Sequence, residues 1–398
     1  MKTAVVDYQK DRSITYEDLE RLSSYVSYNI ENKPKLIWLN LKNSIEFVCC
    51  YYGIIFSDHI CVFSKPDTEH FEININNVYD VLKESPKTEF KINPDAYAFM
   101  MQSSGSTGAP KETYYTHKKR NLILQKMNPE ERVLITTPFS HMNGLSNMEI
   151  ALHSRQTIYI AEKFVASDAL SCIKTRRITK LTGVPSVYEM LCSTGGVINS
   201  VRTIRVASSI LKPETLAKIK TKFVNATIHN SYGISEVGPG LFRHHPNGIK
   251  TPDLSVGYPA EGYEYKIVDG ILFIKTPLMS EFFNTKDLFE VDDAGFYYCK
   301  GRADDVFKCG GYTVNPIEIE IEIEKLDGVE RAIVIPVADA IKENKPICII
   351  ICSIETDDIN SQLNLAEYKK PRKYIKVDTL PMTAVGKVDR KKLKRDYE

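Results

Sequence analysis

The sequence predicts an α/β fold with at least one largely parallel sheet. Short β-branched apolar runs alternate along the chain with segments whose apolar residues recur at helical spacing. The 398 residues exceed what one ordinary compact core accommodates and favour two or three units. We therefore expect a large N-terminal α/β domain with mostly parallel sheets, followed by a small α+β C-terminal domain.

The first helix is predicted after a capping box. Thr15 is followed three residues later by Asp18, so hydroxyl and carboxylate can each accept a hydrogen bond from the other residue's backbone N–H. Four apolar residues then follow at helical spacing: Leu19, Leu22, Val26 and Ile30.

The alternation continues as far as residue 230. Strands are predicted over 36–41, 61–64, 133–137, 157–160, 203–207 and 226–230, and helices over 46–56 and 213–223. The uninterrupted apolar run LIWLNL (36–41) is typical of a parallel strand that is buried on both faces. Pro213 opens the later helix, where its missing N–H costs nothing.

The character of the sequence changes near residue 300. The segment YYCKGRADDVFKCGGY (297–312) is glycine-rich and charged, as a turn or hinge is. An acidic helix (316–326), two apolar strands (331–337 and 347–354) and a basic tail follow. We predict an N-terminal domain over 1–303 and a C-terminal domain over 304–398.

Composition and charge narrow the function classes. The formal net charge of +1, from 52 basic and 51 acidic residues, gives no reason to expect a nucleic acid or an anionic membrane as partner. The N-terminus has no signal-peptide pattern and no run of about 18 apolar residues occurs, so we expect a cytoplasmic protein without a membrane span. The nine cysteines include no CxxC pair, which favours buried thiols over disulfides or a zinc site.

The segment QSSGSTGAPKET (102–113) has the composition of a phosphate-binding loop. Its glycines let backbone N–H groups approach phosphate oxygens, hydroxyls can donate to the same oxygens, and a lysine adds a charge. The candidate residues are Ser103, Ser104, Gly105, Ser106, Thr107, Gly108 and Lys111. The spacing differs from a Walker P-loop, because only two residues separate the glycines and Pro110 precedes the lysine. A plain surface turn is the alternative.

Four further segments follow this loop in order: NSYGISEVGPG (230–240), NTKDLF (284–289), GRADD (301–305) and TAVGKVDR (383–390). Together the five blocks resemble the conserved blocks of the ANL superfamily of adenylate-forming enzymes, which includes acyl-CoA synthetases, adenylation domains of peptide synthetases and luciferases. The resemblance runs from TYEDL (15–19) to the last residues. It implies the ANL fold, in which the small C-terminal domain is mobile.

The resemblance also implies a reaction. A free carboxylate is a poor electrophile, and the family joins it to AMP before a thiol displaces the AMP. The leading hypothesis is an acyl- or aryl-CoA ligase that uses ATP, Mg²⁺ and CoA. One alternative loads an acid or amino acid onto the phosphopantetheine of a carrier protein, and the other is a noncatalytic protein that binds a nucleotide or acyl ligand.

The resemblance assigns the two charged centres of the site. By this match Lys387 is the catalytic lysine that bridges the substrate carboxylate and nucleotide oxygens. Glu236 matches the glutamate associated with Mg²⁺, a metal that prefers oxygen ligands. A basic, solvated helix start is the alternative for Lys387, and an exposed strand-end residue is the alternative for Glu236.

The nucleotide's base and sugar have their own candidate residues. Tyr232 matches the residue that lies against the adenine, Asn230 the residue that reads its amino group, and Ser235 a hydroxyl that reaches the α-phosphate. Asp287 and Arg302 match the pair that binds the ribose hydroxyls. The nucleotide-binding residues implied outside the loop are therefore Ser208, Asn230, Ser231, Tyr232, Gly233, Ser235, Asp287 and Arg302.

The segments after residue 300 match the family's moving parts. Asp304 matches the hinge about which the small domain rotates between adenylation and thiolation. Gly310 and Gly311 match the residues that let a narrow pantetheine arm reach the active site.

The sequence also indicates the kind of acid. PFSHMNGLS (138–146) resembles a motif of acyl- and aryl-CoA ligases in which the histidine, here His141, borders the carboxylate site. This region has no aspartate for an α-ammonium group, which favours an acid without an α-amine. The pocket candidates are His141, Val184, Tyr188, Ala207 and Gly233.

Two features depart from the family pattern. ASSIL (207–211) replaces the usual glycine-rich SGGAPL, and the serines favour a short or aromatic acid with polar groups. The chain is also shorter than most members, although Lys111, Glu236, Asp287, Arg302 and Lys387 are all retained. The particular acid, the thiol acceptor, the pathway and the oligomeric state do not follow from the sequence.

Overall fold

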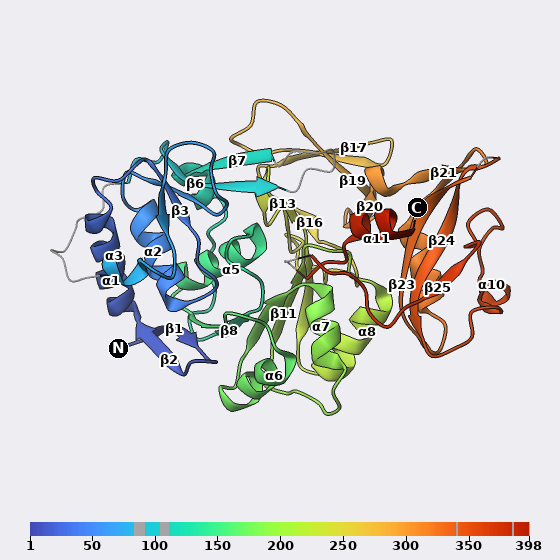
Figure 1. The fold of residues 1–398 in the computed structure, drawn as a ribbon, viewed down its shortest axis with the longest axis horizontal. Helices are drawn as coiled ribbons and strands as arrows, with labels where there is room; N and C mark the ends of the chain where they lie inside the picture. The colour runs from blue at the N-terminus through green and yellow to red at the C-terminus, as the bar shows by residue number, and fades with distance from the viewer. Residues whose placement is uncertain (83–91, 104–110, 340, 384–385, 398) are drawn as a thin grey trace. The chain divides into compact units, whose positions relative to one another are not determined.

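The structure is a computed structural model that describes residues 1–82, 92–103, 111–339, 341–383 and 386–397. Its packing divides the chain into two compact units, each made of two segments (Figure 1). The N-terminal unit comprises Met1–Ser208 and Thr221–Leu241, and the C-terminal unit comprises Ser209–Lys220 and Phe242–Glu398. This grouping by contacts differs from the predicted division at residue 304, which stays a prediction.

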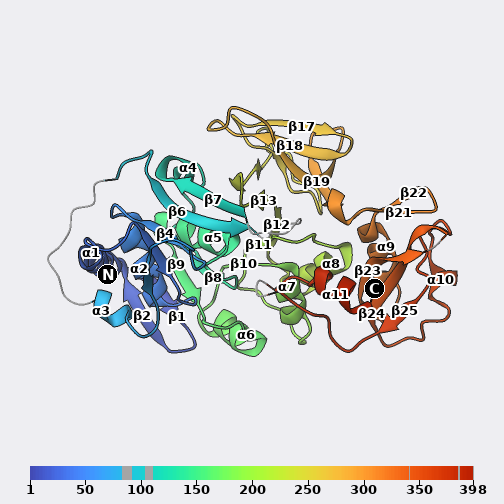
Figure 2. The same ribbon diagram turned by 45° about the horizontal axis from the view of Figure 1, so that its top comes forward.

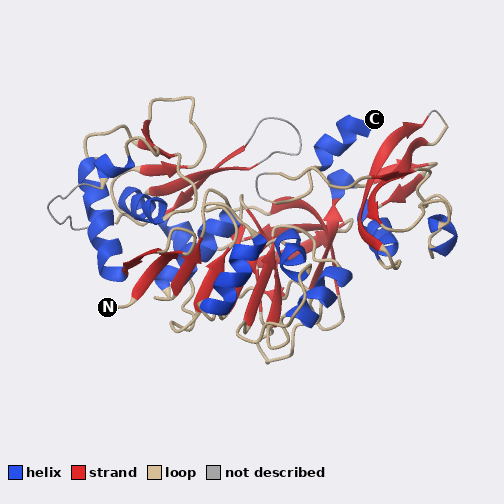
Figure 3. Cartoon of the chain, turned by 60° about the horizontal axis from the view of Figure 1, so that its bottom comes forward, coloured by secondary structure: helices blue, strands red, loops and turns tan. Residues whose placement is uncertain are grey.

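The N-terminal unit contains the parallel sheet that the sequence predicts. Seven strands lie in the order β12-β11-β10-β8-β9-β1-β2, and every neighbouring pair is parallel except β1 and β2. Helices lie over these strands (Figure 3). The strands are β1 (Thr3–Asp7), β2 (Arg12–Thr15), β8 (Arg132–Ile135), β9 (Thr157–Ile160), β10 (Lys180–Gly183), β11 (Thr203–Ala207) and β12 (Thr227–Ser231).

A second sheet of the same unit has the order β5-β3-β4-β6-β7 and is parallel except for the β6–β7 pair. Its strands are β3 (Leu36–Leu39), β4 (Ile60–Val62), β5 (Phe71–Ile73), β6 (Tyr97–Ser103) and β7 (Lys111–Thr116). A hairpin of β13 (Gly233–Ile234) and β14 (Gly238–Pro239) completes the strands of the unit.

The helices of the N-terminal unit are α1 (Tyr16–Asn29), α2 (Ile45–Ile55), α3 (Val78–Val81), α4 (His117–Asn121), α5 (Met142–His153), α6 (Ala166–Thr175) and α7 (Pro185–Cys192). Helix α2 is buried along its whole length and contacts β1 of the first sheet as well as β3, β4 and β6 of the second. This position explains why its sequence is apolar all round.

Helix α1 confirms the predicted capping box. The Thr15 hydroxyl accepts a hydrogen bond from the backbone N–H of Asp18 at 3.1 Å, and the Asp18 carboxylate accepts one from the backbone N–H of Thr15 at 3.1 Å. The hydrogen bonds that the Asp18 carboxylate accepts from the backbone N–H and the hydroxyl of Thr15 hold the pKa of Asp18 below its usual value.

The nine cysteines are all free thiols, and most are buried, including Cys49 and Cys50 in α2. Burial raises the pKa of Cys172 to about 12, so this thiol stays protonated at neutral pH. Within the described part of the chain, no helix combines the length and the apolar character that crossing a membrane requires.

The C-terminal unit is built mainly from antiparallel strands (Figure 2), and only β24 and β25 pair in parallel among its described strands. Its strands are β15 (Phe242–Arg243), β16 (Tyr258–Pro259), β17 (Glu264–Val268), β18 (Ile271–Lys275), β19 (Phe283–Val291), β20 (Tyr297–Arg302), β21 (Phe307–Cys309), β22 (Tyr312–Val314), β23 (Val329–Asp339), β24 (Glu343–Cys352) and β25 (Tyr374–Lys376). Strands β17 to β20 form one sheet and β23 to β25 another. The helices are α9 (Pro316–Glu324), α10 (Ile359–Gln362), α11 (Arg390–Tyr397) and most of α8 (Pro213–Lys222).

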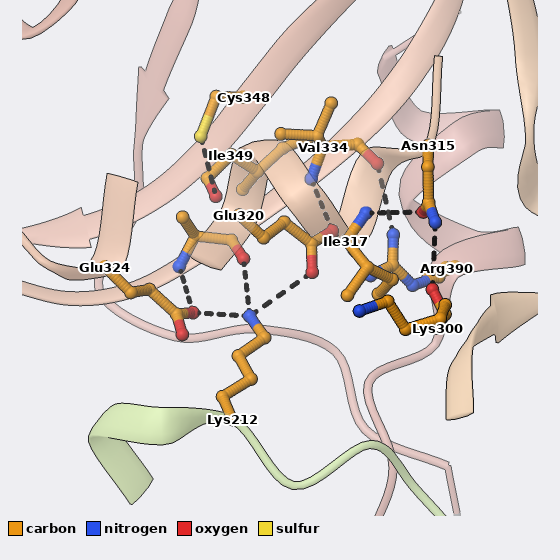
Figure 4. Close-up of polar contacts among 11 residues, drawn as sticks. Lys212, Lys300, Asn315, Ile317, Glu320, Glu324, Val334, Cys348, Ile349 and Arg390 are labelled. Atoms are coloured by element: carbon orange, nitrogen blue, oxygen red, sulfur yellow. Dashed lines mark hydrogen bonds and ion pairs between the residues drawn. The ribbon is translucent and has the colours of Figure 1, made fainter. Parts of the chain in front are cut away.

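A buried ionic cluster joins three distant segments of the C-terminal unit (Figure 4). Lys212 Nζ lies 3.2 Å from Glu320 Oε2 and 2.7 Å from Glu324 Oε1, and Arg390 pairs with the other oxygen of Glu320. The backbone N–H groups of Val334 and Ala332 also donate to Glu320 at 2.9 Å and to Glu324 at 2.8 Å.

The two carboxylates of this cluster differ electrostatically. Burial alone raises the pKa of Glu320, but the charges of Arg390 and Lys212 outweigh it and leave the pKa below its ordinary value. Burial raises the pKa of Glu324 above its ordinary value, because Lys212 offsets that effect only in part. The ionised form of Glu320 therefore stabilises the fold, whereas ionisation of Glu324 works against it.

We expect Glu320→Gln to lower the free energy of unfolding by about 3 kcal/mol at pH 7, because it leaves buried cations underpaired. Glu324→Gln, one helical turn away, serves as the matched control and is expected to change it by less than about 1 kcal/mol. Urea unfolding measures both. The folded state favours the ionised form of Glu320, so the stabilisation by this carboxylate is lost as the pH falls below 4.5. The difference in unfolding free energy between the wild type and Glu320→Gln should therefore shrink at low pH. Equal losses in the two variants would contradict this assignment.

Strand β11 leads into Ser208, whose backbone has φ +72°. This left-handed conformation brings the Cβ of a non-glycine residue close to the backbone. Ser209, the next residue, is not among the non-glycine residues with positive φ.

Ser208→Gly is expected to raise the free energy of unfolding by about 0.5–1 kcal/mol, because glycine adopts this backbone without the Cβ contact. The control Ser209→Gly makes the same chemical change at an ordinary φ and should lower it by about as much. The urea midpoints of the two variants test this difference, which vanishes if the strain at Ser208 has no energetic cost.

Candidate functional site

Three predicted pocket residues and one predicted nucleotide-binding residue, Ser231, lie at the carboxyl ends of neighbouring strands. His141 comes after β8, Val184 after β10, Ala207 ends β11, and Ser231 ends β12. These four strands are adjacent and parallel, so their ends lie at one edge of the sheet. The carboxyl edge of such a sheet is where ligands bind in open α/β folds.

The strand order also reverses at this edge. Strand β9 lies on one side of β8, whereas β10, β11 and β12 follow on the other side. The chain connections that leave the carboxyl ends of β8 and β10 therefore run in opposite directions, which is the topology at which open α/β sheets bind ligands. His141 follows the strand at which this reversal occurs.

His141 is exposed and occupies the N-cap position of α5. Its backbone N–H donates to the carbonyl of Pro138 at 3.2 Å, and its carbonyl accepts from Leu145 at 2.9 Å. A Cβ at Gly144 would lie 2.1 Å from the Pro138 oxygen, so only glycine permits this close turn. The glycine of the PFSHMNGLS motif thus has a structural reason.

Asn43, which is not among the residues predicted from the sequence, fixes the loop before His141. This buried side chain donates from Nδ2 to the carbonyl of Thr137 at 3.0 Å and accepts at Oδ1 from the backbone N–H of Phe139 at 2.8 Å. Both partners lie more than ninety residues away in the chain. No local pattern around Asn43 indicates this role.

Val184 and Tyr188 are buried at the start of α7. The Tyr188 hydroxyl donates to the carbonyl of Arg205 in β11 at 2.8 Å. Burial raises the pKa of Tyr188 well above its usual value, so the phenol stays neutral. The structure thus gives this hydroxyl a backbone partner, and its predicted place in the acid pocket stays a prediction.

The NSYGISE block spans the end of β12 and the β13–β14 hairpin. Asn230 and Ser231 belong to β12, and the half-buried Tyr232 follows them. A Cβ at Gly233 would lie 2.6 Å from the Cα of Pro239 across the hairpin, which accounts for the glycine at this position. The hairpin turn consists of residues 235–237 and includes Ser235 and Glu236.

Two side chains from the β7–α4 segment bind this turn. Tyr115 donates from its hydroxyl to the Ser235 carbonyl at 2.6 Å, and Lys119 Nζ donates to the Glu236 carbonyl at 2.8 Å. Burial lowers the pKa of Lys119 to about 8, although the Glu236 charge acts in the opposite direction. The sequence analysis did not single out either residue.

The predicted phosphate loop connects β6 with β7. Ser103 is the last residue of β6 and pairs with Lys111, the exposed first residue of β7. The candidates between them lie outside the described residues: Ser104, Gly105, Ser106, Thr107 and Gly108. The structure thus places the two ends of the loop on neighbouring antiparallel strands.

Asp287 and Arg302, the predicted ribose pair, are cross-strand partners in β19 and β20 of the C-terminal unit. Arg302 NH1 lies 3.0 Å from Oδ1 of the buried Asp287. Asp304, the predicted hinge residue, lies 3.9 Å from Arg302 NH2 and 3.5 Å from Lys286 Nζ. Arg302, a ribose candidate, therefore interacts with both Asp287 and the hinge candidate Asp304.

Lys387, in the same unit, is hydrogen-bonded to Thr383. Its backbone N–H donates to the Thr383 hydroxyl at 3.2 Å, and its carbonyl accepts from the Thr383 N–H at 2.7 Å. Burial lowers the pKa of this half-buried lysine; Asp287 acts to raise it and Arg302 to lower it. Three predicted site residues from three separate blocks thus lie within electrostatic reach of one another.

Gly310 and Gly311 form the two-residue turn between β21 and β22, with φ values of +58° and +83°. A hairpin turn with two positive φ angles matches the twist of its strands and favours glycine at both positions. This geometry explains the two glycines by itself, and their role toward a thiol stays a prediction.

The described residues contain no group of three or more His, Cys, Asp or Glu side chains that could hold a metal ion. Mg²⁺ bound with a triphosphate needs only one or two protein carboxylates. The single carboxylate of Glu236, on a turn that is held by two side chains, fits that requirement.

Comparison with known proteins identifies the family. The AMP-binding enzyme family matches residues 68–271, more than half of the chain, and the AMP-binding enzyme C-terminal domain matches residues 318–387. The 2-succinylbenzoate–CoA ligase of Staphylococcus epidermidis is 26% identical to this chain over an alignment that covers 96% of it and 93% of that relative. The ligase of the same name from Staphylococcus aureus is 28% identical and covers 83% of this chain and 73% of its own length.

Solved structures agree with the predicted α/β fold. The anthranilate CoA ligase AuaEII in complex with anthranoyl-AMP has a TM-score of 0.87 and 22% identity, with coverage of 100% of this chain and 94% of that one. The o-succinylbenzoate CoA synthetase (MenE) from Bacillus subtilis, in complex with ATP and a magnesium ion, has a TM-score of 0.80 and 21% identity, with coverage of 99% and 96%. The predicted fold class is confirmed, and this chain belongs to the AMP-binding enzyme family of adenylate-forming enzymes.

Proposed function

We propose that this chain is an AMP-forming acid–CoA ligase. It joins a carboxylic acid to the α-phosphate of ATP, releases pyrophosphate, and passes the acyl group to the thiol of CoA with release of AMP. The observation that carries this proposal is the grouping of Lys387, Asp287 and Arg302, which come from three separate family blocks. Family membership and the names of the relatives support the same reaction.

Adenylation places negative charge on the atoms that react, and the chain supplies cations for it. The Lys387 ammonium would bind the acid's carboxylate and the nucleotide oxygens as charge shifts to the leaving pyrophosphate. Arg302 and Asp287 would hold the ribose hydroxyls, so that the nucleotide lies within reach of Lys387. Lys111 would bind the outgoing phosphates from the start of β7.

Glu236 would hold the metal. Bound Mg²⁺ neutralises phosphate charge and polarises the bond that breaks. The backbone around Glu236 is held at both neighbouring carbonyls, so its carboxylate starts from a defined position. Asn230 and Tyr232, on the same stretch of chain, would bind the adenine.

We infer that the acid is aromatic and lacks an α-amine. The pocket candidates Val184 and Tyr188 are buried, and by the resemblance Ser208 stands where the family commonly has glycine. Two of the similar proteins are CoA ligases named for aryl acids, 2-succinylbenzoate and anthranilate. His141 would border the carboxylate at the edge of the sheet.

Pyrophosphate exchange across a panel of acids tests this function. We expect exchange with aryl acids such as benzoate, anthranilate and 2-succinylbenzoate, and little with long fatty acids or amino acids. CoA and a phosphopantetheinylated carrier protein are then compared as acceptors. Exchange with amino acids, or transfer to the carrier alone, would replace the proposal with a carrier-loading enzyme. No exchange with any acid, together with retained ATP binding, would identify a noncatalytic nucleotide-binding protein.

Lys387→Ala is expected to lower the rate of adenylate formation by roughly 100-fold or more, because it removes the cation at the developing charge. Transfer of the acyl group from supplied acyl-AMP to CoA should change little. Single-turnover assays of the two half-reactions measure this split. Exposed Lys391, in the following helix, provides the control Lys391→Ala, which should preserve both rates. Equal loss of both half-reactions in Lys387→Ala would remove it from this role.

A further inference from the structure

In the turn that carries Glu236, side chains donate hydrogen bonds to the backbone carbonyls. Residues 235–237 connect β13 and β14, where Ile234 pairs with Gly238. Carbonyls inside a three-residue turn cannot all pair across the hairpin, and backbone carbonyls that are shielded from water need another partner. Two consecutive carbonyls, of Ser235 and Glu236, receive donors from Tyr115 and Lys119.

These two carbonyls determine the position of one side chain. The Ser235 carbonyl belongs to the peptide plane before the Glu236 Cα, and the Glu236 carbonyl to the plane after it. Each peptide unit is planar, so holding both planes sets the φ and ψ of Glu236 and hence the direction of its Cα–Cβ bond.

The donors themselves are held rigidly. Tyr115 is fully buried, and its ring stacks on Phe99, its cross-strand neighbour in β6, with centroids 4.7 Å apart and planes 12° apart. Lys119 Nζ lies 4.0 Å from the centre of the Tyr115 ring. The cation, the ring and the carbonyls therefore support one another.

We infer that Tyr115 and Lys119 are positioning residues that orient Glu236 for Mg²⁺ bound with ATP; this inference rests on the proposed function. Both residues belong to the segment that begins with Lys111, since β7 runs from Lys111 to Thr116 and α4 follows directly. The segment thereby couples the end of the phosphate loop to the metal-binding turn. A change at either donor acts on the metal through the backbone of Glu236.

The test measures ATP binding by calorimetry, with and without saturating Mg²⁺ and without any acid. Tyr115→Phe keeps the stacked ring and removes only the hydroxyl, and Lys119→Met removes the ammonium. In the double variant we expect ATP to bind as in the wild type without Mg²⁺, and the gain in affinity from Mg²⁺ to fall by about tenfold. Lys119→Arg, which keeps a cationic donor, should recover most of that gain.

Two controls separate positioning from a general loss of structure. Exposed Lys118 is the neighbour of Lys119, and Lys118→Met should leave the Mg²⁺ gain unchanged. In a Glu236→Gln background, adding Tyr115→Phe and Lys119→Met should change the Mg²⁺ gain by less than about twofold, because the three residues act through one carboxylate. Thermal unfolding of each variant shows how much of the effect is stability.

The outcomes distinguish this inference from the proposed function. If the wild type binds ATP more tightly with Mg²⁺ and the double variant gains as much, the positioning role is wrong and the function stands. A double variant that only unfolds earlier, with its Mg²⁺ gain intact, also overturns it. If the wild type binds no ATP, both the function and the positioning role are overturned.

Discussion

Parallel pairing of β8, β10, β11 and β12 is the constraint on which the N-terminal part of the site depends. The carboxyl ends of parallel strands all lie at one edge of the sheet. Residues that are up to ninety positions apart along the chain therefore lie at the same edge. His141, Val184, Ala207 and Ser231 each follow or end a different strand. The strand order reverses at β8, so the connections that leave β8 and β10 diverge at that edge. The order and direction of the strands therefore determine where these candidate residues lie.

In the C-terminal unit, buried charged side chains are paired with side chains of opposite charge. Glu320 is fully buried yet remains favourably ionised, because two cations and a backbone N–H compensate for the lost hydration. Asp287 is buried against Arg302, which also lies near Asp304. Lys387 interacts electrostatically with this pair, and burial disfavours its charge.

Hydrogen bonds between side chains and backbone groups hold the two segments that carry His141 and Glu236. Asn43 binds the loop before His141 through its amide, and Tyr115 and Lys119 bind the turn of Glu236. In each case a side chain from a distant segment of the chain binds polar backbone groups of the loop or turn. These hydrogen bonds hold the loop and the turn in place without regular secondary structure.

The sequence by itself determined the features whose causes are local. The Thr15–Asp18 capping box, the helix opened by Pro213 and the apolar strand and helix runs depend on near neighbours, and the structure confirms each of them. The five family blocks likewise identified the family, because each block is a continuous stretch of chain. Only the tertiary structure decided the partners of Asn43, Tyr115, Lys119 and Lys212, since they lie between about 90 and 120 residues away. Such pairings arise from how sheets and hairpins pack, and no periodicity in the sequence records them.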